Sequence, residues 1–134
     1  MEMTPYLTFD GNCTEALNFY AEVFGGEAVI TMTVRQSPMA DQFPAEQQDK
    51  VMHGTVSIGS RALMGSDSLM APFVAPTGFN IQVAFDDVDK AKRVFDRLAR
   101  FGEISMAFEP TFFAPGFGIC RDRFGMPWMI ACMG

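Results

Sequence analysis

Apolar residues recur every three or four positions in two stretches of the chain, which is the spacing of a helix buried along one face. The apolar positions are Cys13, Ala16, Leu17, Tyr20, Val23 and Phe24 in the first stretch, and Val88, Ala91, Val94 or Phe95, and Leu98 in the second. A residue suited to capping a helix precedes each stretch, Asn12 in the first and Asp87 in the second. Glycines follow, at 25–26 and at 102. The pattern predicts two helices whose apolar stripes cover a sheet.

The segments around these helices have the composition of β-strands, because they are short, apolar and bounded by turn residues. One such segment precedes each helix, within residues 4–10 and 80–86. Further strands are predicted at 28–34, 52–58, 61–66, 103–108, 117–121 and 127–132. Gly59 and Ser60 form a two-residue connection with glycine first, which is typical of a type II′ hairpin turn. Residues 36–50 are predicted to form a loop, and residues 67–78 a linker.

The two halves of the chain repeat this order of elements. Phe-Asp ends the first strand of each half, at 9–10 and 85–86, and Gly-Glu follows each helix, at 26–27 and 102–103. The repeat predicts an α+β fold with two tandem βαβββ units, residues 1–70 and 75–134. The length of 134 residues suits a single domain.

Composition excludes several classes of function. The net charge is −6, the isoelectric point is near 4.6 and the ten basic residues are scattered, which argues against a nucleic-acid partner. No apolar stretch is long enough to span a membrane, and no secretory signal is recognisable at the start. A cytoplasmic location is therefore expected, and the odd number of cysteines, three, favours free thiols over a disulfide framework.

The chain has one histidine against 14 phenylalanines and 11 methionines. His53 and the three cysteines do not have the spacing of a classical zinc module. His53 is the only imidazole, and so the only side chain whose usual pKa suits proton transfer near neutrality.

Short motifs cover most of the chain. They are Pro5-Tyr6-Leu7, Phe9-Asp10-Gly11-Asn12-Cys13, Ala16-Leu17, Phe19-Tyr20, Phe24-Gly25-Gly26, Met52-His53-Gly54, Ile58-Gly59-Ser60-Arg61-Ala62-Leu63-Met64, Ser66-Asp67 and Asp122-Arg123-Phe124-Gly125-Met126-Pro127-Trp128. Together with the repeated unit, they resemble the vicinal oxygen chelate superfamily of glyoxalase I, bleomycin-resistance proteins and extradiol dioxygenases. Within that superfamily the resemblance is to the PhnB-like branch, which has carried a 3-demethylubiquinone methyltransferase label. The resemblance implies a curved mixed sheet around a concave cavity, with the helices on the outer face.

The resemblance also implies four strand positions at which superfamily enzymes hold a divalent metal through His, Glu or Gln. In this sequence they fall at about Thr4 or Pro5, Met64, Asn80 and Met129. None of these is a ligand of that kind, so the usual metal site is expected to be lost and no cofactor is expected. No glycine-rich strand-to-helix turn of a Rossmann methyl-donor site is present.

Strand alternation predicts which side chains face the cavity. If Met64 faces inward, the pairing of residue 55 with residue 64 places Thr55 and His53 on the same face. By the repeat, Gly118 and Cys120 are placed beside Met129, and Arg121 is turned away. The predicted ligand-binding residues are Tyr6, Thr8, His53, Thr55, Met64, Asn80, Gln82, Cys120 and Met129.

Three roles stay open for His53: a hydrogen-bonded residue at the rim of a strand, a ligand contact, or a catalytic acid or base. Cys120 is expected to be either an inert buried thiol or, with a positive neighbour, a nucleophile. The leading functional prediction is a cavity that binds a small, partly apolar organic molecule without the usual metal. The alternatives are a lyase- or isomerase-type enzyme that uses His53 or a non-standard metal site, and a drug-sequestering protein whose acidic chain suits cationic compounds.

Two loops, residues 69–74 and 112–117, are too apolar for ordinary solvated loops. They are predicted to lie in the interface of a homodimer or, as the alternative, to close the pocket.

Overall fold

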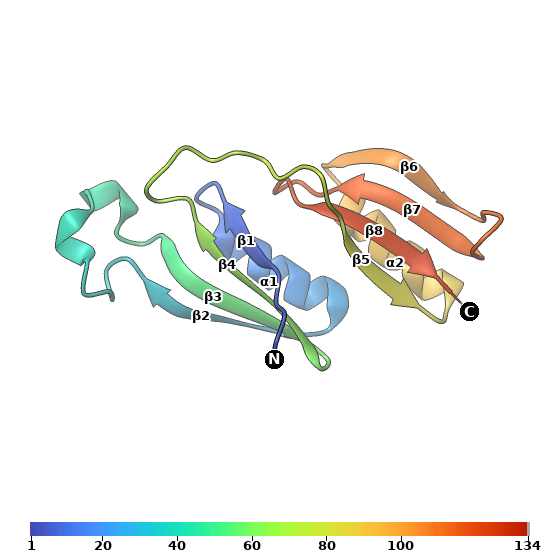
Figure 1. The fold of residues 1–134 in the computed structure, drawn as a ribbon, viewed down its shortest axis with the longest axis horizontal. Coiled ribbons are helices and arrows are strands. Elements are labelled where there is room, and N and C mark those ends of the chain that lie inside the picture. Colours follow the sequence, from blue (N-terminus) through green and yellow to red (C-terminus); the bar gives the residue numbers. More distant parts are fainter. Residues whose placement is uncertain (134) are drawn as a thin grey trace. The chain divides into compact units, whose positions relative to one another are not determined.

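The computed structural model describes residues 1–133, which form two compact units, Met1–Phe73 and a second unit that begins at Val74. The first unit consists of β1 (Tyr6–Phe9), α1 (Cys13–Phe24), β2 (Glu27–Thr33), β3 (Val51–Ile58) and β4 (Arg61–Asp67) (Figure 1). The second consists of β5 (Ile81–Phe85), α2 (Val88–Ala99), β6 (Glu103–Glu109), β7 (Gly116–Arg121) and β8 (Pro127–Cys132). The predicted α+β fold of two βαβββ units is confirmed. That both units belong to one domain stays a prediction.

Each unit contains a four-stranded mixed sheet, with strand orders β1-β4-β3-β2 and β5-β8-β7-β6. The first and last strands of each unit, β1 with β4 and β5 with β8, pair in parallel, and the other pairs are antiparallel. One helix packs on each sheet (Figure 1). We call the opposite side of each sheet its helix-free face.

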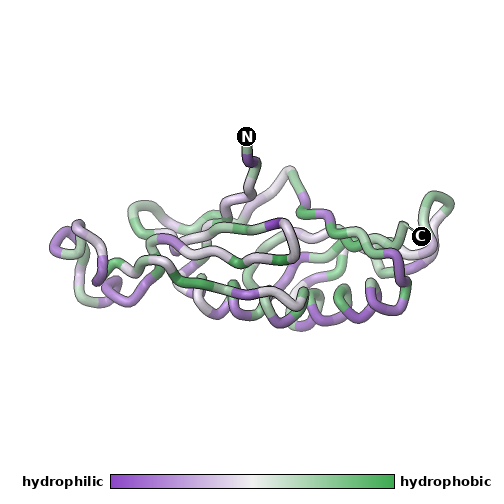
Figure 2. Tube along the Cα trace, turned by 90° about the horizontal axis from the view of Figure 1, so that it is seen from below, coloured by the Kyte–Doolittle hydropathy of each residue, from purple (hydrophilic) through white to green (hydrophobic). Residues whose placement is uncertain are grey.

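The predicted apolar stripes of both helices are buried. The buried residues are Cys13, Ala16, Leu17, Tyr20 and Val23 in α1, and Ala91, Val94, Phe95 and Leu98 in α2. Figure 2 shows hydrophilic and hydrophobic residues alternating along the helices, as expected when one side of a helix packs on a sheet. Within residues 1–133, no helix has the length and apolar character needed to cross a membrane.

The two helices are capped in different ways. Asp87 caps α2 as predicted, because its Oδ1 accepts hydrogen bonds from the backbone N–H groups of Asp89 and Lys90, at 2.8 and 3.2 Å. Asn12 occupies the corresponding place before α1, but its side chain makes no capping bond. Asp67 replaces it.

The Asp67 carboxylate connects the start of α1 to the start of β3. Its Oδ1 accepts from the Cys13 N–H at 2.9 Å, and its Oδ2 accepts from the Val51 N–H at 2.8 Å. Asp67 is buried and is the last residue of β4. The linker predicted from residue 67 therefore begins one residue later, because β4 continues far enough to bring this carboxylate to the helix.

The glycines after the helices serve two purposes. Gly25 ends α1 with a φ of 72°, in the left-handed region that glycine adopts most readily. After α2 the left-handed residue is Phe101, with a φ of 63°, so the prediction that Gly102 supplies this stop is wrong. Gly102 allows close packing instead, since a Cβ there would lie 2.1 Å from the Arg121 carbonyl oxygen.

The hairpins that close the two units differ in length. In the first, Gly59 has a φ of 59°, and Thr55 pairs with Met64 as predicted. In the second, residues 122–126 connect the last strand pair, Arg121 with Pro127. This longer connection decides which residues of β7 share a face with Met129.

Candidate functional site

The helix-free face of the first unit carries four of the predicted site residues. Met64 lies between Tyr6 on β1 and Thr55 on β3, because it is the register partner of both. Thr8 lies two residues beyond Tyr6 on the same side of β1. The alternate residue Leu7 is buried, as expected for the face that packs on α1.

His53 completes this group through a contact with Tyr6. The Tyr6 Oη lies 3.3 Å from the His53 Nδ1. The two rings are stacked, with centroids 5.7 Å apart and planes inclined by 27°. In a neutral imidazole that is protonated on Nε2, Nδ1 accepts a hydrogen bond from the phenol O–H. The Tyr6 phenol therefore contacts the imidazole of His53 by both a hydrogen bond and ring stacking.

The helix-free face of the second unit is more apolar. Met129 pairs with Gln82 on β5 and with Ile119 on β7, so these three side chains share a face. A hydrophobic cluster continues along it, made of Ala114, Phe117 and Ala131 with Ile119 and Met129 packed against them. The structure therefore places Gln82 and Met129 together at the edge of an apolar surface.

Gly118 and Cys120 lie on the other side of this sheet, so the prediction that they stand beside Met129 is wrong. Cys120 pairs with Trp128 and is 1% exposed. A Cβ at Gly118 would lie 2.6 Å from a ring carbon of Phe95 in α2. Because of the hairpin of residues 122–126, the residue that corresponds to Thr55 is Ile119 and not Gly118. A shift of one residue exchanges the two faces of a strand. The same shift turns Arg121 to the helix-free face.

Burial also determines the chemistry of the cysteines. All three are buried and free, which confirms the prediction of free thiols. Burial, and then the neighbouring Asp122 carboxylate, raise the pKa of the Cys120 thiol to about 12. Burial and then the Asp67 carboxylate raise the pKa of Cys13 to about 12 as well. Because the thiolate is the nucleophile, Cys120 is suited to packing rather than to attack on a substrate.

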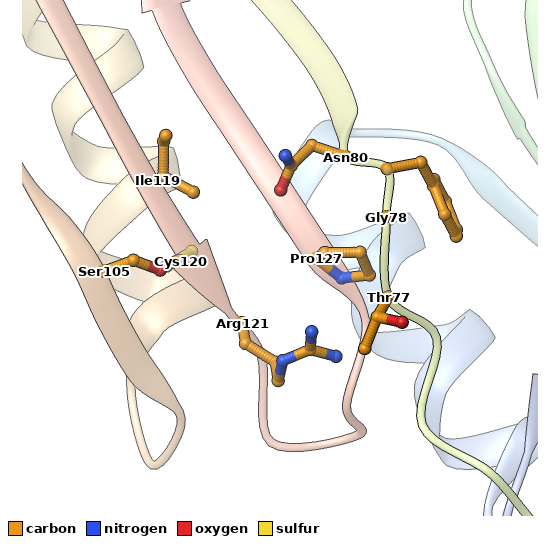
Figure 3. A pocket seen from close by; sticks show the side chains of 9 residues that line it. Thr77, Gly78, Asn80, Ser105, Ile119, Cys120, Arg121 and Pro127 are labelled. Atoms are coloured by element: carbon orange, nitrogen blue, oxygen red, sulfur yellow. The ribbon is translucent and has the colours of Figure 1, made fainter.

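A pocket of about 300 Å³ opens in the second unit where the chain enters β5 (Figure 3). Its lining residues are Thr77, Gly78, Phe79, Asn80, Ser105, Ile119, Cys120, Arg121 and Pro127. Asn80 was among the predicted site residues. Arg121 and Ser105 were not predicted as site residues. The length of the hairpin that follows Arg121 was the signal that could have placed its side chain on the helix-free face. Cys120 borders the pocket but exposes almost none of its surface.

The residues at the strand positions where the resemblance implies metal ligands do not fit a divalent metal ion. Met64 and Met129 offer thioethers and Asn80 offers an amide, whereas hard and borderline ions prefer carboxylate or imidazole donors. Among residues 1–133, no three His, Cys, Asp or Glu side chains are grouped so that they could hold a metal ion.

Comparisons with known proteins agree with this fold. Residues 1–131 match the family model described as 3-demethylubiquinone-9 3-methyltransferase. The chain is 35% identical to protein YjdN of Escherichia coli, over 97% of this chain and 94% of that protein.

Two solved structures are similar over nearly the whole chain. A protein from Pseudomonas aeruginosa is 38% identical with a TM-score of 0.89, covering 98% of this chain and 97% of the other. A PhnB protein from Bacillus cereus is 25% identical with a TM-score of 0.83, covering 98% and 99%. The chain therefore belongs to the 3-demethylubiquinone-9 3-methyltransferase family, and it is similar to PhnB over nearly its whole length.

Proposed function

We propose that this PhnB-like protein binds a small, partly apolar organic molecule on the helix-free side of its sheets, without the superfamily's usual divalent metal. The observation that carries the proposal is the pocket of about 300 Å³ in the second unit. It combines an apolar floor at Ile119 and Pro127 with a few polar groups, which is the usual composition of a small-molecule site. The neighbouring cluster around Phe117 extends the apolar surface.

Methyl transfer is not part of this proposal. A methyl-donor site of the Rossmann type needs a parallel, doubly wound sheet and a glycine-rich turn. The sheets formed by residues 1–133 are mixed, and most of their strand pairs are antiparallel. The thioether and amide donors at Met64, Met129 and Asn80 likewise support binding without a hard metal ion.

An enzyme that uses His53 as an acid or base is the second candidate. It is supported by the contact between the Tyr6 Oη and the His53 Nδ1, because an oriented imidazole is the common general acid or base near neutral pH. Tyr6, Thr8, Thr55 and Met64 are proposed as ligand contacts around it in the first unit. Separately, Gln82 and Met129 are proposed as contacts for a ligand on the helix-free face of the second unit. Sequestration of a cationic drug has less support in the pocket, since the charged side chain lining it is that of Arg121.

The binding proposal is tested with a library of small organic fragments and ¹⁵N-labelled protein. We expect fragments with an apolar ring to shift the amide signals of Asn80, Ser105 and Ile119. Ser105→Phe is expected to fill the pocket and weaken this binding at least about tenfold, because it occupies the volume of the ligand. Ser57→Phe is the matched control, since Ser57 is also an exposed serine on a strand, in the first unit.

Each bound fragment is also incubated with the protein to detect turnover. Turnover that is lost in His53→Ala and lowered in Tyr6→Phe supports the enzyme. Binding without turnover, and unchanged in His53→Ala, supports a binding protein. If no fragment shifts the pocket amides, or if Ser105→Phe binds as well as the original chain, the proposed function is wrong.

We also propose that the protein is a cytoplasmic homodimer. Its buried free thiols suit a reducing compartment. Phe112 is fully exposed, and Met70 and Val74 are each more than four-fifths exposed, which favours contact with a second copy over exposure to water.

Sedimentation velocity at micromolar concentration is therefore expected to show a dimer. Phe112→Ser is expected to shift the equilibrium towards monomer, because it removes an apolar contact. Thr111, the neighbour of Phe112, is not a suitable control, because it is partly buried and its Oγ1 donates a hydrogen bond within its own loop. The matched control is Val29→Ser, which changes an exposed apolar residue of the sheet in the first unit. A monomer at this concentration in the original chain would contradict the proposal.

A further inference from the structure

Arg121 supplies the positive charge of the pocket in the second unit. Figure 3 shows its guanidinium extending from β7 towards Thr77. Within residues 1–133, its recorded hydrogen bond is the one that Nη1 donates to the backbone carbonyl of Gly125. A guanidinium has five N–H donors. Most of its hydrogen-bonding capacity therefore remains for a ligand.

The described part of the chain offers this guanidinium no paired carboxylate. Among the described residues, Arg121 takes part in neither of the ion pairs Arg35–Asp49 and Lys92–Asp96. Glu103 is the cross-strand register partner of Arg121, yet the two make no ion pair. The adjacent carboxylate, that of Asp122, is buried and accepts hydrogen bonds from its own hairpin and from Trp128. A negatively charged ligand would therefore provide a counter-ion that the chain itself does not.

The other groups of the pocket limit the charge and size of that ligand. Thr77, Ser105 and Asn80 contribute neutral polar groups, and Figure 3 shows the Asn80 carboxamide turned towards β8. With one cation in the lining and a net charge of −6 on the chain, a single negative charge fits better than a phosphate dianion. The volume lies at the lower end of the range for small-molecule sites, about 300–1,000 Å³.

We propose that this pocket binds a small organic carboxylate, with the carboxylate on Arg121 and the apolar body on Ile119 and Pro127. The two oxygens of a carboxylate match the planar fork of a guanidinium. The proposal rests on the proposed function and adds to it the charge and class of the ligand.

Benzoate, benzamide, phenylphosphonate and benzylamine are the probes, titrated into the ¹⁵N-labelled full chain. They share a phenyl ring but carry a carboxylate, a neutral amide, a phosphonate and an ammonium group. Benzoate is expected to bind most tightly, as followed by the amide signals of Ser105 and Ile119. Benzamide is expected to bind about ten- to hundredfold more weakly, because it loses the charge-assisted hydrogen bonds to Arg121.

Variants of the charged residues test the assignment to Arg121. Arg121→Gln is expected to weaken benzoate about ten- to hundredfold and to leave benzamide nearly unchanged. Arg121→Lys keeps the charge without the fork, so it should retain part of the affinity. Glu103→Gln removes the neighbouring negative charge and should strengthen benzoate severalfold. Because Arg121 also bonds Gly125, the melting temperature and the Trp128 fluorescence of each variant report whether the hairpin is intact.

The possible failures are distinguishable. Equal binding of benzoate by the original chain and by Arg121→Gln would overturn the carboxylate site, as would tighter binding of benzamide, phenylphosphonate or benzylamine. In those cases the pocket still binds small molecules, and the proposed function stands. If none of the four probes shifts the pocket amides at millimolar concentration while fragments of the library do, the carboxylate inference fails alone. If the library also fails, both fail.

Discussion

Asp122→Ala is expected to lower the free energy of unfolding by about 3–6 kcal/mol. Asp122 is 3% exposed, and its carboxylate accepts hydrogen bonds from two backbone N–H groups and from one indole N–H. Oδ1 accepts from the backbone N–H groups of Phe124 and Met126, at 2.9 and 3.0 Å, and Oδ2 accepts from the Trp128 Nε1–H at 2.8 Å. A buried donor left without an acceptor costs about 1–3 kcal/mol. The loss is large against a typical domain stability of about 5–15 kcal/mol.

Urea unfolding and calorimetry measure this effect, and a fall of roughly 10–20 °C in the melting temperature is expected. Asp86→Ala is the matched control, because Asp86 is an exposed aspartate of the same unit, and it should change stability by less than about 0.5 kcal/mol. Asp122→Asn keeps one acceptor oxygen and should lose less than Asp122→Ala.

A double-mutant cycle with Trp128→Phe separates the indole bond from the two backbone bonds. After Trp128→Phe, the indole donor is gone, so Asp122→Ala should cost about 1–3 kcal/mol less than it does in the original chain. Additive losses would contradict a direct bond between the two side chains. A loss below about 1 kcal/mol for Asp122→Ala alone would show that this carboxylate does not hold the hairpin.

The sequence predicted the helices and strands because their signals are local. The stripe from Cys13 to Val23 and the glycine at 25 lie within one element, and the structure follows them closely. The cap of α1 could not be found in this way, because Asp67 lies 54 residues from Cys13. The local candidate, Asn12, has the right residue type but not the geometry.

The prediction of the candidate site was correct where side chains simply alternate between the two faces of a strand. It failed where a longer hairpin changes the register of the strand pair. In the first unit the two-residue turn at Gly59 gives the pairing of Thr55 with Met64 directly. In the second unit the register depends on how the Asp122 side chain folds the longer connection, which is a tertiary property. Cys120 was therefore placed on the wrong face, and the charged residue of the pocket, Arg121, was missed.

Gly26→Ala is expected to destabilise the protein by about 3 kcal/mol or more. A Cβ at this position would lie 2.0 Å from the backbone carbonyl oxygen of Ser57, closer than real Cβ contacts come. Overpacking against side chains typically costs about 1–3 kcal/mol. Here the obstacle is the backbone of β3, which cannot change rotamer, so the strand must move away from the end of α1.

Gly25→Ala is the matched control, and denaturant unfolding of the two variants measures the difference. A Cβ at Gly25 has no atom within 4 Å, but its φ of 72° makes alanine strained there by about 1 kcal/mol. If only backbone conformation mattered, Gly25→Ala would be the more harmful change, and that order would contradict the prediction.

Gly102 occupies the same place in the second unit, where a Cβ would lie 2.1 Å from the Arg121 carbonyl oxygen. Gly102→Ala should therefore cost about as much as Gly26→Ala. Equal losses would explain the Gly-Glu pair that both halves of the chain share. In each unit, glycine is needed where the chain leaving the helix passes close to the backbone of the third strand. This shared contact explains why both halves of the sequence have glycine at this position.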